Sequence, residues 1–336
     1  MEPSGSVADY LASLPAGLAP SLLPAGALRA WQAASGALPL ALGRHVLLER
    51  RLAPEGERID LHLAVPRRAA AHPFLQSAAA GNAVSAFAQR WRDESVCGAR
   101  EEVDHIWLSY DFTGGVLTRP HLYVRADRSP RASLRALLAP LLPGPVAEDL
   151  ARSLQAVPPR PTYVGLVQRR PAPLQLRLIW YLPRREALPL LDRVGWPGER
   201  EPVDRWLRVV AGPVTGVGLV LDVYRRPSPH LGVEFMNGPH SLPWSEVLGR
   251  LVTEGLCLPG QQADLLAFPD LTLQRPAWPY PLQSGPAGAG QAVGALRRRL
   301  SHLKLNFAPG GRPILKAYLS LKHGWLCHPA SLAGER

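Results

Sequence analysis

Ionisable and aromatic side chains recur at every second position along several stretches of the chain. The positions between them carry mostly apolar side chains. Tyrosine and tryptophan beside arginine, lysine and histidine suit a site that binds an anion and shelters an apolar or cationic group. The recurring set comprises His105, Trp107, Ser109, Asp111, His121, Tyr123, Arg125, Gln175, Arg177, Tyr181, Asp222, Tyr224, Glu234, His302, Lys304, Asn306, Lys316, Tyr318, Ser320 and Lys322.

Lysine is rare in this basic chain, and its three copies lie close together. The sequence has 336 residues, 38 of them Lys or Arg against 27 Asp or Glu, and a formal net charge of +11. The only lysines are Lys304, Lys316 and Lys322. Because arginine is used everywhere else, we infer that some of these positions need the point charge of an ammonium group. The net charge favours an anionic partner, but the scattered arginines do not favour nucleic acid.

Five pairs of alternating segments predict β-hairpins that would carry these side chains. The alternation has the period of two that half-buried strands show, and each pair flanks a turn with Gly or Pro. Helical patterns separate the hairpins at residues 74–92, 133–141 with 146–156, 186–194 with 203–210, and 244–254 with 261–268. The hairpins are His45 to Leu52 with Arg58 to Val65, His105 to Phe112 with Pro120 to Ala126, Thr162 to Gln168 with Leu174 to Leu182, Val217 to Tyr224 with Leu231 to Met236, and His302 to Phe307 with Leu315 to Lys322.

The repeated hairpin and helix-pair units predict an α+β protein in which a ten-stranded antiparallel β-barrel is surrounded by helices. A flat sheet of ten strands would leave two edges to protect, whereas closure removes both. Helices outside the barrel would cover the apolar face of each strand and leave the polar face inside. The alternative is a one-sided sheet whose polar face meets solvent.

One barrel domain accounts for most of the chain. We expect residues 1–44 to form a helical segment that packs on the barrel, residues 45–325 to form the catalytic domain, and residues 326–336 to form a tail. Within the domain, residues 269–300 include a Pro/Gly-rich stretch and are expected to form a loop or lid.

At this point the chain resembles the ABBA prenyltransferases, whose repeated units close into a ten-stranded barrel. The resemblance covers roughly residues 45 to 322 and rests on architecture plus Lys316-Ala317-Tyr318, which looks like the K-x-Y pattern of the indole-prenylating members. It implies that Lys316 and Tyr318 hold a prenyl diphosphate. By their place on the polar faces we add Lys304, Arg177 and Arg125 as diphosphate ligands. Trp107, Tyr123 and Tyr181 are expected to shield the allylic cation.

The acceptor must lose a proton, and Asp111, Glu234 and Asp222 are the candidate bases. Several carboxylates in one lumen would suit a cationic group. We therefore expect transfer of a dimethylallyl or geranyl group to an Arg, Trp, Tyr or His side chain of a ribosomally made peptide. The alternatives are prenylation of a small indole or phenol and a non-catalytic barrel that binds a peptide or anion.

Other chemistry is not indicated. The three cysteines are scattered, which favours neither disulfides nor a zinc site and fits a reducing cytoplasm. There is no phosphate-binding G-x-x-x-x-G-K loop and no dinucleotide-binding loop, and no apolar stretch free of proline predicts a membrane span. We expect no required cofactor and no metal ligands in the chain, although bound magnesium is compatible with a diphosphate substrate.

Overall fold

The fold repeats one unit of a β-hairpin followed by helices. The computed structural model describes residues 6–12, 19–39, 42–43, 45–52, 59–77, 80–93, 103–113, 116–118, 120–156, 159–168, 174–210, 214–236, 243–274 and 292–327. The wall strands are β1 (His45–Arg51), β2 (Ile59–Pro66), β3 (His105–Tyr110), β6 (His121–Arg125), β7 (Tyr163–Gln168), β8 (Leu174–Pro183), β9 (Gly216–Tyr224), β10 (Arg226–Met236), β12 (Ala292–Phe307) and β13 (Ile314–Cys327). A small hairpin of β4 (Phe112–Thr113) and β5 (Val116–Leu117) lies between β3 and β6.

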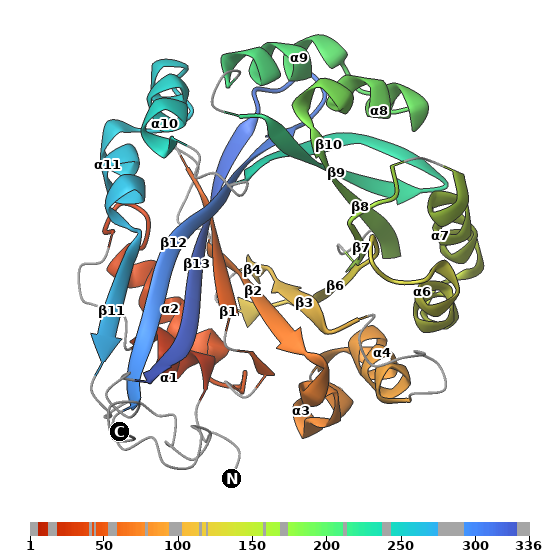
Figure 1. Cartoon of the computed structure of the whole chain (residues 1–336), viewed down its shortest axis with the longest axis horizontal. Helices are drawn as coiled ribbons and strands as arrows, with labels where there is room; N and C mark the ends of the chain where they lie inside the picture. The colour runs from red at the N-terminus through yellow and green to blue at the C-terminus, as the bar shows by residue number, and fades with distance from the viewer. Residues whose placement is uncertain are drawn as a thin grey trace, which may run out of the picture.

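These ten wall strands form a closed antiparallel barrel, which confirms the predicted fold class. Each strand pairs with the next in the order β10-β9-β8-β7-β6-β3-β2-β1-β13-β12, and β12 pairs with β10 to complete the circle. Figure 1 looks into this ring of strands. The closing register places Glu234 of β10 opposite Lys304 of β12. No wall strand is left with an unpaired edge along the closing segment, which is the advantage that closure offers.

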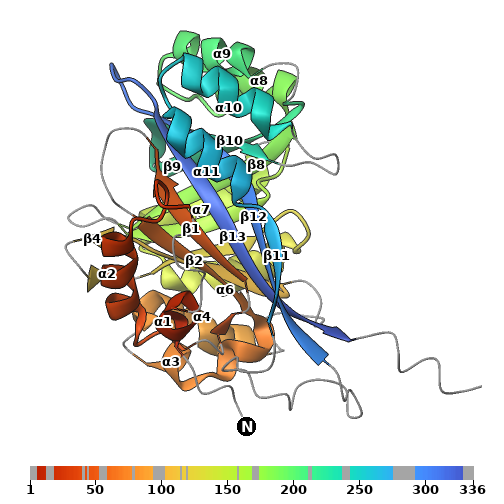
Figure 2. The same ribbon diagram turned by 90° about the vertical axis from the view of Figure 1, so that its left-hand side faces the viewer.

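The helices lie outside the barrel, and the outward side chains of the strands pack against them. They are α3 (Pro73–Gln76), α4 (Asn82–Arg92), α6 (Arg131–Leu138), α7 (Gly144–Ala156), α8 (Ala187–Arg193), α9 (Arg200–Val209), α10 (Trp244–Thr253) and α11 (Pro259–Ala267). Figures 1 and 2 show them around the wall. On α9, Val203, Trp206 and Leu207 are buried at the spacing of one helical face. The outward residues predicted from the alternation, such as Leu108 and Leu319, belong to the same apolar shell.

The N-terminal segment also packs on the barrel wall. It contains α1 (Val7–Ala12) and α2 (Ala25–Ser35), and Trp31 of α2 is almost completely buried. The indole N–H of Trp31 donates to the carbonyl of Ile59 on β2 at 2.8 Å. Ser21 donates from its backbone N–H and its hydroxyl to Asp264 on α11, at 2.8 and 2.6 Å. This segment therefore connects β2 with the last helix pair. Among the described residues, no helix has both the length and the apolar character needed to span a bilayer.

The last hairpin is longer than the alternation predicted, and part of the expected loop is strand. Residues 270–274 form β11 (Asp270–Gln274), which pairs with residues 294–298 of β12. Residues 275–291 and 328–336 lie outside the described part of the chain. The first part of β12 contains the run Arg297-Arg298-Arg299, which places charge on both faces of the strand. The alternation of polar and apolar residues therefore did not reveal this part of β12. The ends of β11, β12 and β13 project beyond their neighbours in Figure 2.

Two adjacent leucines of β1 test whether the wall has an apolar outer face and a polar inner face. Leu48 belongs to the outer shell, whereas Leu47 lies on the other face, opposite His62 and Ser320. We expect Leu48→Ala to lower the free energy of unfolding by about 3 kcal/mol, because it leaves a cavity in close-packed apolar surroundings. Leu47→Ala should cost about 1 kcal/mol, because its polar neighbours can be solvated. Urea unfolding measures both, and equal losses would contradict this assignment.

Candidate functional site

The inward faces of the strands carry a small apolar cluster of their own. It consists of Tyr123, Val167, Ile179 and Val220, with Trp107 and Tyr163 packed against it. This interior cluster is separate from the outer shell. Aromatic faces next to aliphatic side chains suit an apolar group, and they also attract a cation.

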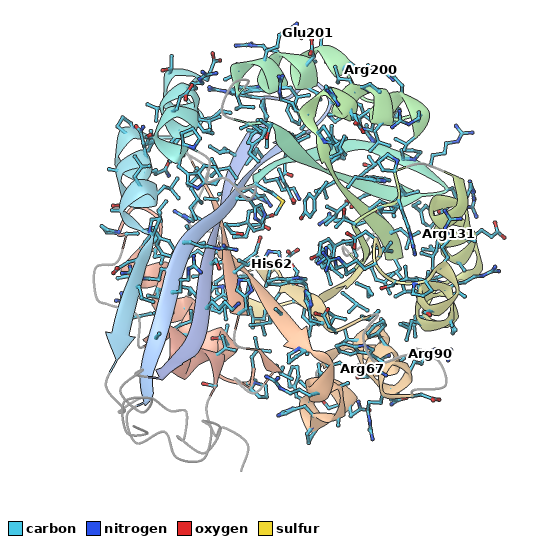
Figure 3. All side chains as sticks on the ribbon, viewed as in Figure 1. His62, Arg67, Arg90, Arg131, Arg200 and Glu201 are labelled. Atoms are coloured by element: carbon cyan, nitrogen blue, oxygen red, sulfur yellow. The ribbon has the colours of Figure 1, made fainter. Side chains whose placement is uncertain are left out.

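A buried carboxylate on β1 is at the centre of the first charged group. Glu49 accepts hydrogen bonds from the Lys316 ammonium, from the Tyr318 hydroxyl at 2.5 Å and from His62 Nε2 at 3.1 Å. Burial by itself would raise the pKa of Glu49, but the charge of Lys316 and the bond from His62 outweigh it and hold the pKa well below its ordinary value. Glu49 is therefore anionic at neutral pH, and Figure 3 shows His62 directed toward the barrel interior.

The second charged group crosses the strand pair that closes the barrel. Lys304 on β12 lies 3.3 Å from Glu234 Oε1, and the Tyr181 hydroxyl donates to Glu234 Oε2 at 3.2 Å. The Lys304 and Glu234 side chains are more than nine-tenths buried. Although burial would raise the pKa of Glu234, the Lys304 charge lowers it below its ordinary value.

The third charged group joins the ionic network to the interior cluster. Arg177 on β8 donates to both oxygens of Asp222 on β9, at 2.6 and 2.8 Å. Arg177 also donates to the Tyr123 hydroxyl at 3.0 Å. Such a bidentate pair is geometrically specific and strong. Because the Tyr123 ring belongs to the interior cluster, the charged and apolar parts of the barrel interior meet at this residue.

Each of these three cations thus has its own carboxylate. Removing one partner from a buried ion pair leaves an uncompensated charge and commonly costs about 3–5 kcal/mol. In each pair, the two side chains therefore hold each other in place. The pairs are Lys316–Glu49, Lys304–Glu234 and Arg177–Asp222. Within these three pairs the positive and negative charges balance.

A neutral histidine stacks on the first group. The rings of His302 and Tyr318 are 3.9 Å apart between centroids and nearly parallel. Burial lowers the pKa of His302 to about 4. The Glu234 charge acts to raise this pKa, but the Lys304 charge opposes it. Burial and the adjacent Glu49 charge raise the pKa of Tyr318 well above its ordinary value, so its hydroxyl stays a hydrogen-bond donor.

Two inward glycines let tyrosine rings lie along the barrel wall. A Cβ atom at Gly165 would be 2.7 Å from the Tyr123 ring, and one at Gly218 would be 2.7 Å from the Tyr181 ring. Both distances are too short for ordinary contact. The glycines therefore determine the direction in which these tyrosines point, and with it the position of their hydroxyl groups.

The structure separates the predicted site residues into two sets. Lys316, Tyr318, Lys304, Arg177, Glu234, Asp222, Tyr123 and Tyr181 are brought together in the three charged groups, and Trp107 packs on the interior cluster. Asp111 lies just beyond the end of β3, partly exposed and 3.6 Å from His121. Arg125 pairs with Asp127 at 2.9 Å near the other end of the barrel. These two residues take no part in the charged groups.

The sequence reasoning missed Glu49 and His62 as site residues. Both lie in segments that were recognised as strands, and both have the same alternation as the inward positions. Following that alternation along β1 and β2 would have found them. Among the described residues, no group of three or more His, Cys, Asp and Glu side chains is arranged to hold a metal ion.

Solved prenyltransferase structures have the same fold. No protein-family model matches the sequence, and no curated protein matches it either. The apo form of the prenyltransferase PriB is 15% identical, with a TM-score of 0.51, 93% of this chain covered and 96% of that one. The 5-dimethylallyltryptophan synthase of Streptomyces coelicolor is 15% identical, with a TM-score of 0.50 and 93% of each chain covered. The 6-dimethylallyltryptophan synthase of Micromonospora olivasterospora, in complex with DMASPP and Trp, is 16% identical, with a TM-score of 0.51, 94% of this chain covered and 96% of that one.

The buried His302 predicts that stability falls with acid. Its pKa is about 4 in the folded chain against 6.5 as the ordinary value, so between these pH values the unfolded chain binds a proton that the folded chain does not. Stability therefore decreases as pH falls through this window, by about 2 kcal/mol from His302 between pH 7 and pH 5. Urea unfolding at both pH values measures the loss.

His302→Gln provides the control for this prediction. The substitution removes the titrating ring and should reduce the difference between the two pH values, whatever it does to stability at pH 7. An unchanged difference in His302→Gln would show that other groups cause the acid sensitivity.

Proposed function

We propose that this chain is a prenyltransferase that moves a dimethylallyl or geranyl group from its diphosphate to a nucleophilic acceptor. The proposal rests on one observation: inside a closed barrel, an aromatic and aliphatic cluster adjoins buried charged groups, and Tyr123 belongs to both. An allylic diphosphate needs this combination, because its tail is apolar, its head is anionic and its reactive carbon becomes cationic.

The residues support the reaction in separable ways. When the allylic C–O bond breaks, the electron pair leaves with the diphosphate and positive charge develops on the allyl carbon. The faces of Trp107, Tyr123 and Tyr163 can stabilise that charge. The acceptor then forms a bond to the allyl carbon and loses a proton. Glu49 and Glu234 are anionic, so either can accept a hydrogen bond from an acceptor N–H or O–H group.

The two glutamates are better placed as proton acceptors than Asp222 or Asp111. An ionised carboxylate has about four acceptor positions. Both Asp222 oxygens accept from the Arg177 guanidinium, which cannot take up a further proton, and Asp111 lies outside the charged groups. Glu49 receives three hydrogen bonds, one of them from His62, which offers a route for the proton to leave.

An aromatic acceptor fits this interior better than a cationic one. The excess of carboxylates had suggested a guanidinium acceptor, but each of the three buried carboxylates is paired with a cation of the chain itself. The solved structures with this fold include PriB in ternary complex with L-tryptophan and dimethylallyl thiolodiphosphate. We therefore propose an indole or phenol acceptor, either as a free amino acid or as a Trp or Tyr residue of a ribosomally made peptide.

Incubation with dimethylallyl or geranyl diphosphate tests the proposed function. The acceptor panel contains free tryptophan and tyrosine, small indoles and phenols, and peptides with Trp, Tyr, His or Arg. We expect a mass gain of one prenyl unit on an aromatic acceptor. A product only on Arg or His peptides would overturn the acceptor class. If no acceptor gains mass and neither diphosphate protects the chain against unfolding, the barrel is not a prenyltransferase.

Replacing the three buried carboxylates one at a time tests their roles. We expect Glu49→Gln to lower kcat by about 100-fold or more, because it removes the negative charge that accepts the proton. Asp222→Asn should lower kcat least, because the bidentate partner of Asp222 is Arg177, whose guanidinium cannot pass a proton on. Each variant breaks a comparable ion pair, so urea unfolding should show similar losses. A kcat loss that follows stability alone would contradict the role of Glu49.

A further inference from the structure

Four basic side chains meet at the end of the barrel where β1 begins. Arg297 of β12 lies directly opposite Lys322 of β13, and Lys322 lies directly opposite His45 of β1. Arg299 occupies the neighbouring position on the same face, opposite Ser320. We call Arg297, Arg299, Lys322 and His45 the basic rim. Residues directly opposite each other share a face of the sheet, and like charges in such pairs are destabilising.

The rim contrasts with the charged groups deeper in the barrel. There, Lys304, Lys316 and Arg177 each have a carboxylate partner. Within the described ranges, by contrast, no carboxylate forms an ion pair with Arg297, Arg299 or Lys322. Among the described residues, three cations without a carboxylate partner therefore share the inward face at this end.

The outer face of the same strand shows the opposite arrangement. Arg298 lies between Arg297 and Arg299 and points to the other side of β12. It pairs with Asp270 of β11 and lies over the Phe268 ring. In the part of the chain that the structure describes, the outward arginine of this run thus has a carboxylate partner and the two inward arginines have none.

His45 connects the rim to the interior. Its Nε2 lies 2.9 Å from the Ser320 hydroxyl, and its ring packs edge-on against Trp107 with 5.0 Å between centroids. Burial together with the charges of Lys322 and Arg299 lowers the pKa of His45 to about 4. At neutral pH His45 is thus an uncharged ring that presents hydrogen-bonding groups beside two cations.

The register continues from the rim to the interior cluster. His45 is opposite Ala64, Ala64 is opposite Trp107, and Trp107 is opposite Tyr123. One row of the wall therefore runs from uncompensated positive charge, past a small residue, to aromatic rings. A molecule with an anionic head and a short apolar tail matches this order.

We propose that the basic rim is an anion-binding site that holds the diphosphate of the prenyl donor. The inference rests on the proposed function for the identity of the donor. The sequence predicted Lys316, Lys304 and Arg177 as diphosphate ligands, but each of them is already paired with a carboxylate. In this proposal the main diphosphate contacts come instead from Lys322, Arg299 and Arg297. A carboxylate of the acceptor has similar chemistry and is the competing source of the anion.

Binding of inorganic pyrophosphate to the full chain tests the site without requiring turnover. Isothermal titration calorimetry at low salt should show binding to the native chain. We expect Lys322→Gln and Arg299→Gln each to raise the Kd about tenfold or more, as loss of a charge-assisted contact does. Arg226→Gln removes the same charge from an exposed position at the start of β10, at the opposite end of the barrel, and should leave the Kd within about twofold.

Thermal unfolding separates a binding role from a structural one. Arg297, Arg299 and Lys322 are exposed and repel one another. Lys322→Gln should therefore leave the Tm of the free chain unchanged or raise it, while reducing the stabilisation by pyrophosphate. A native chain that does not bind pyrophosphate, or rim variants that bind it as tightly as Arg226→Gln does, would overturn the inference.

Steady-state kinetics identify the source of the anion. With the diphosphate at the rim, Lys322→Gln should raise the KM for the prenyl donor and leave the KM for the acceptor unchanged. A rise confined to the KM for a carboxylate-bearing acceptor, absent for its amine analogue without the carboxylate, would overturn the diphosphate assignment. Pyrophosphate binding at the rim without prenyl transfer would contradict the proposed function alone, whereas transfer with an unchanged donor KM in Lys322→Gln would contradict the rim alone.

Discussion

Charge buried inside a closed barrel must be neutralised by a partner, and this constraint organises the interior of the protein. Glu49, Glu234 and Asp222 would each be costly to bury alone in a medium of low dielectric constant. Each is instead paired with a cation on a neighbouring strand. The pairs across β10 and β12 and across β8 and β9 are directly opposed in register, so ionic pairing and strand pairing reinforce one another.

The same constraint separates two kinds of positive charge. Lys316, Lys304 and Arg177 in the middle of the barrel are compensated by carboxylates. Tyrosine hydroxyls donate to two of these carboxylates, and the Tyr123 hydroxyl accepts from Arg177. Such an interior avoids a strong positive potential where a carbocation would form. Among the described residues, the cations at the rim have no carboxylate partner, and we propose that they bind an anionic head group. In the proposed function, this separation would give the two ends of an allylic diphosphate different electrostatic surroundings along one wall of the barrel.

The outer shell makes this interior possible. Apolar side chains on the outward faces pack under the helices and supply the hydrophobic stabilisation that the polar inner faces cannot. Small residues on the inner faces have the complementary role, because Gly165 and Gly218 leave room for the rings of Tyr123 and Tyr181 along the wall. The outward faces of the strands thus stabilise the fold, and the inward faces of the same strands position the site residues.

The sequence by itself determined which faces the strands bury, because alternation with period two follows from backbone geometry alone. It predicted the ten strands, the helices outside and most members of the charged groups. Only the tertiary structure decided which side chains pair, because Glu49 and Lys316 are 267 positions apart and meet through the pairing of β1 with β13. Strand β11 likewise depends on its pairing with residues 294–298 of β12, and Arg298 finds its carboxylate partner, Asp270, on β11. No local pattern identifies either contact.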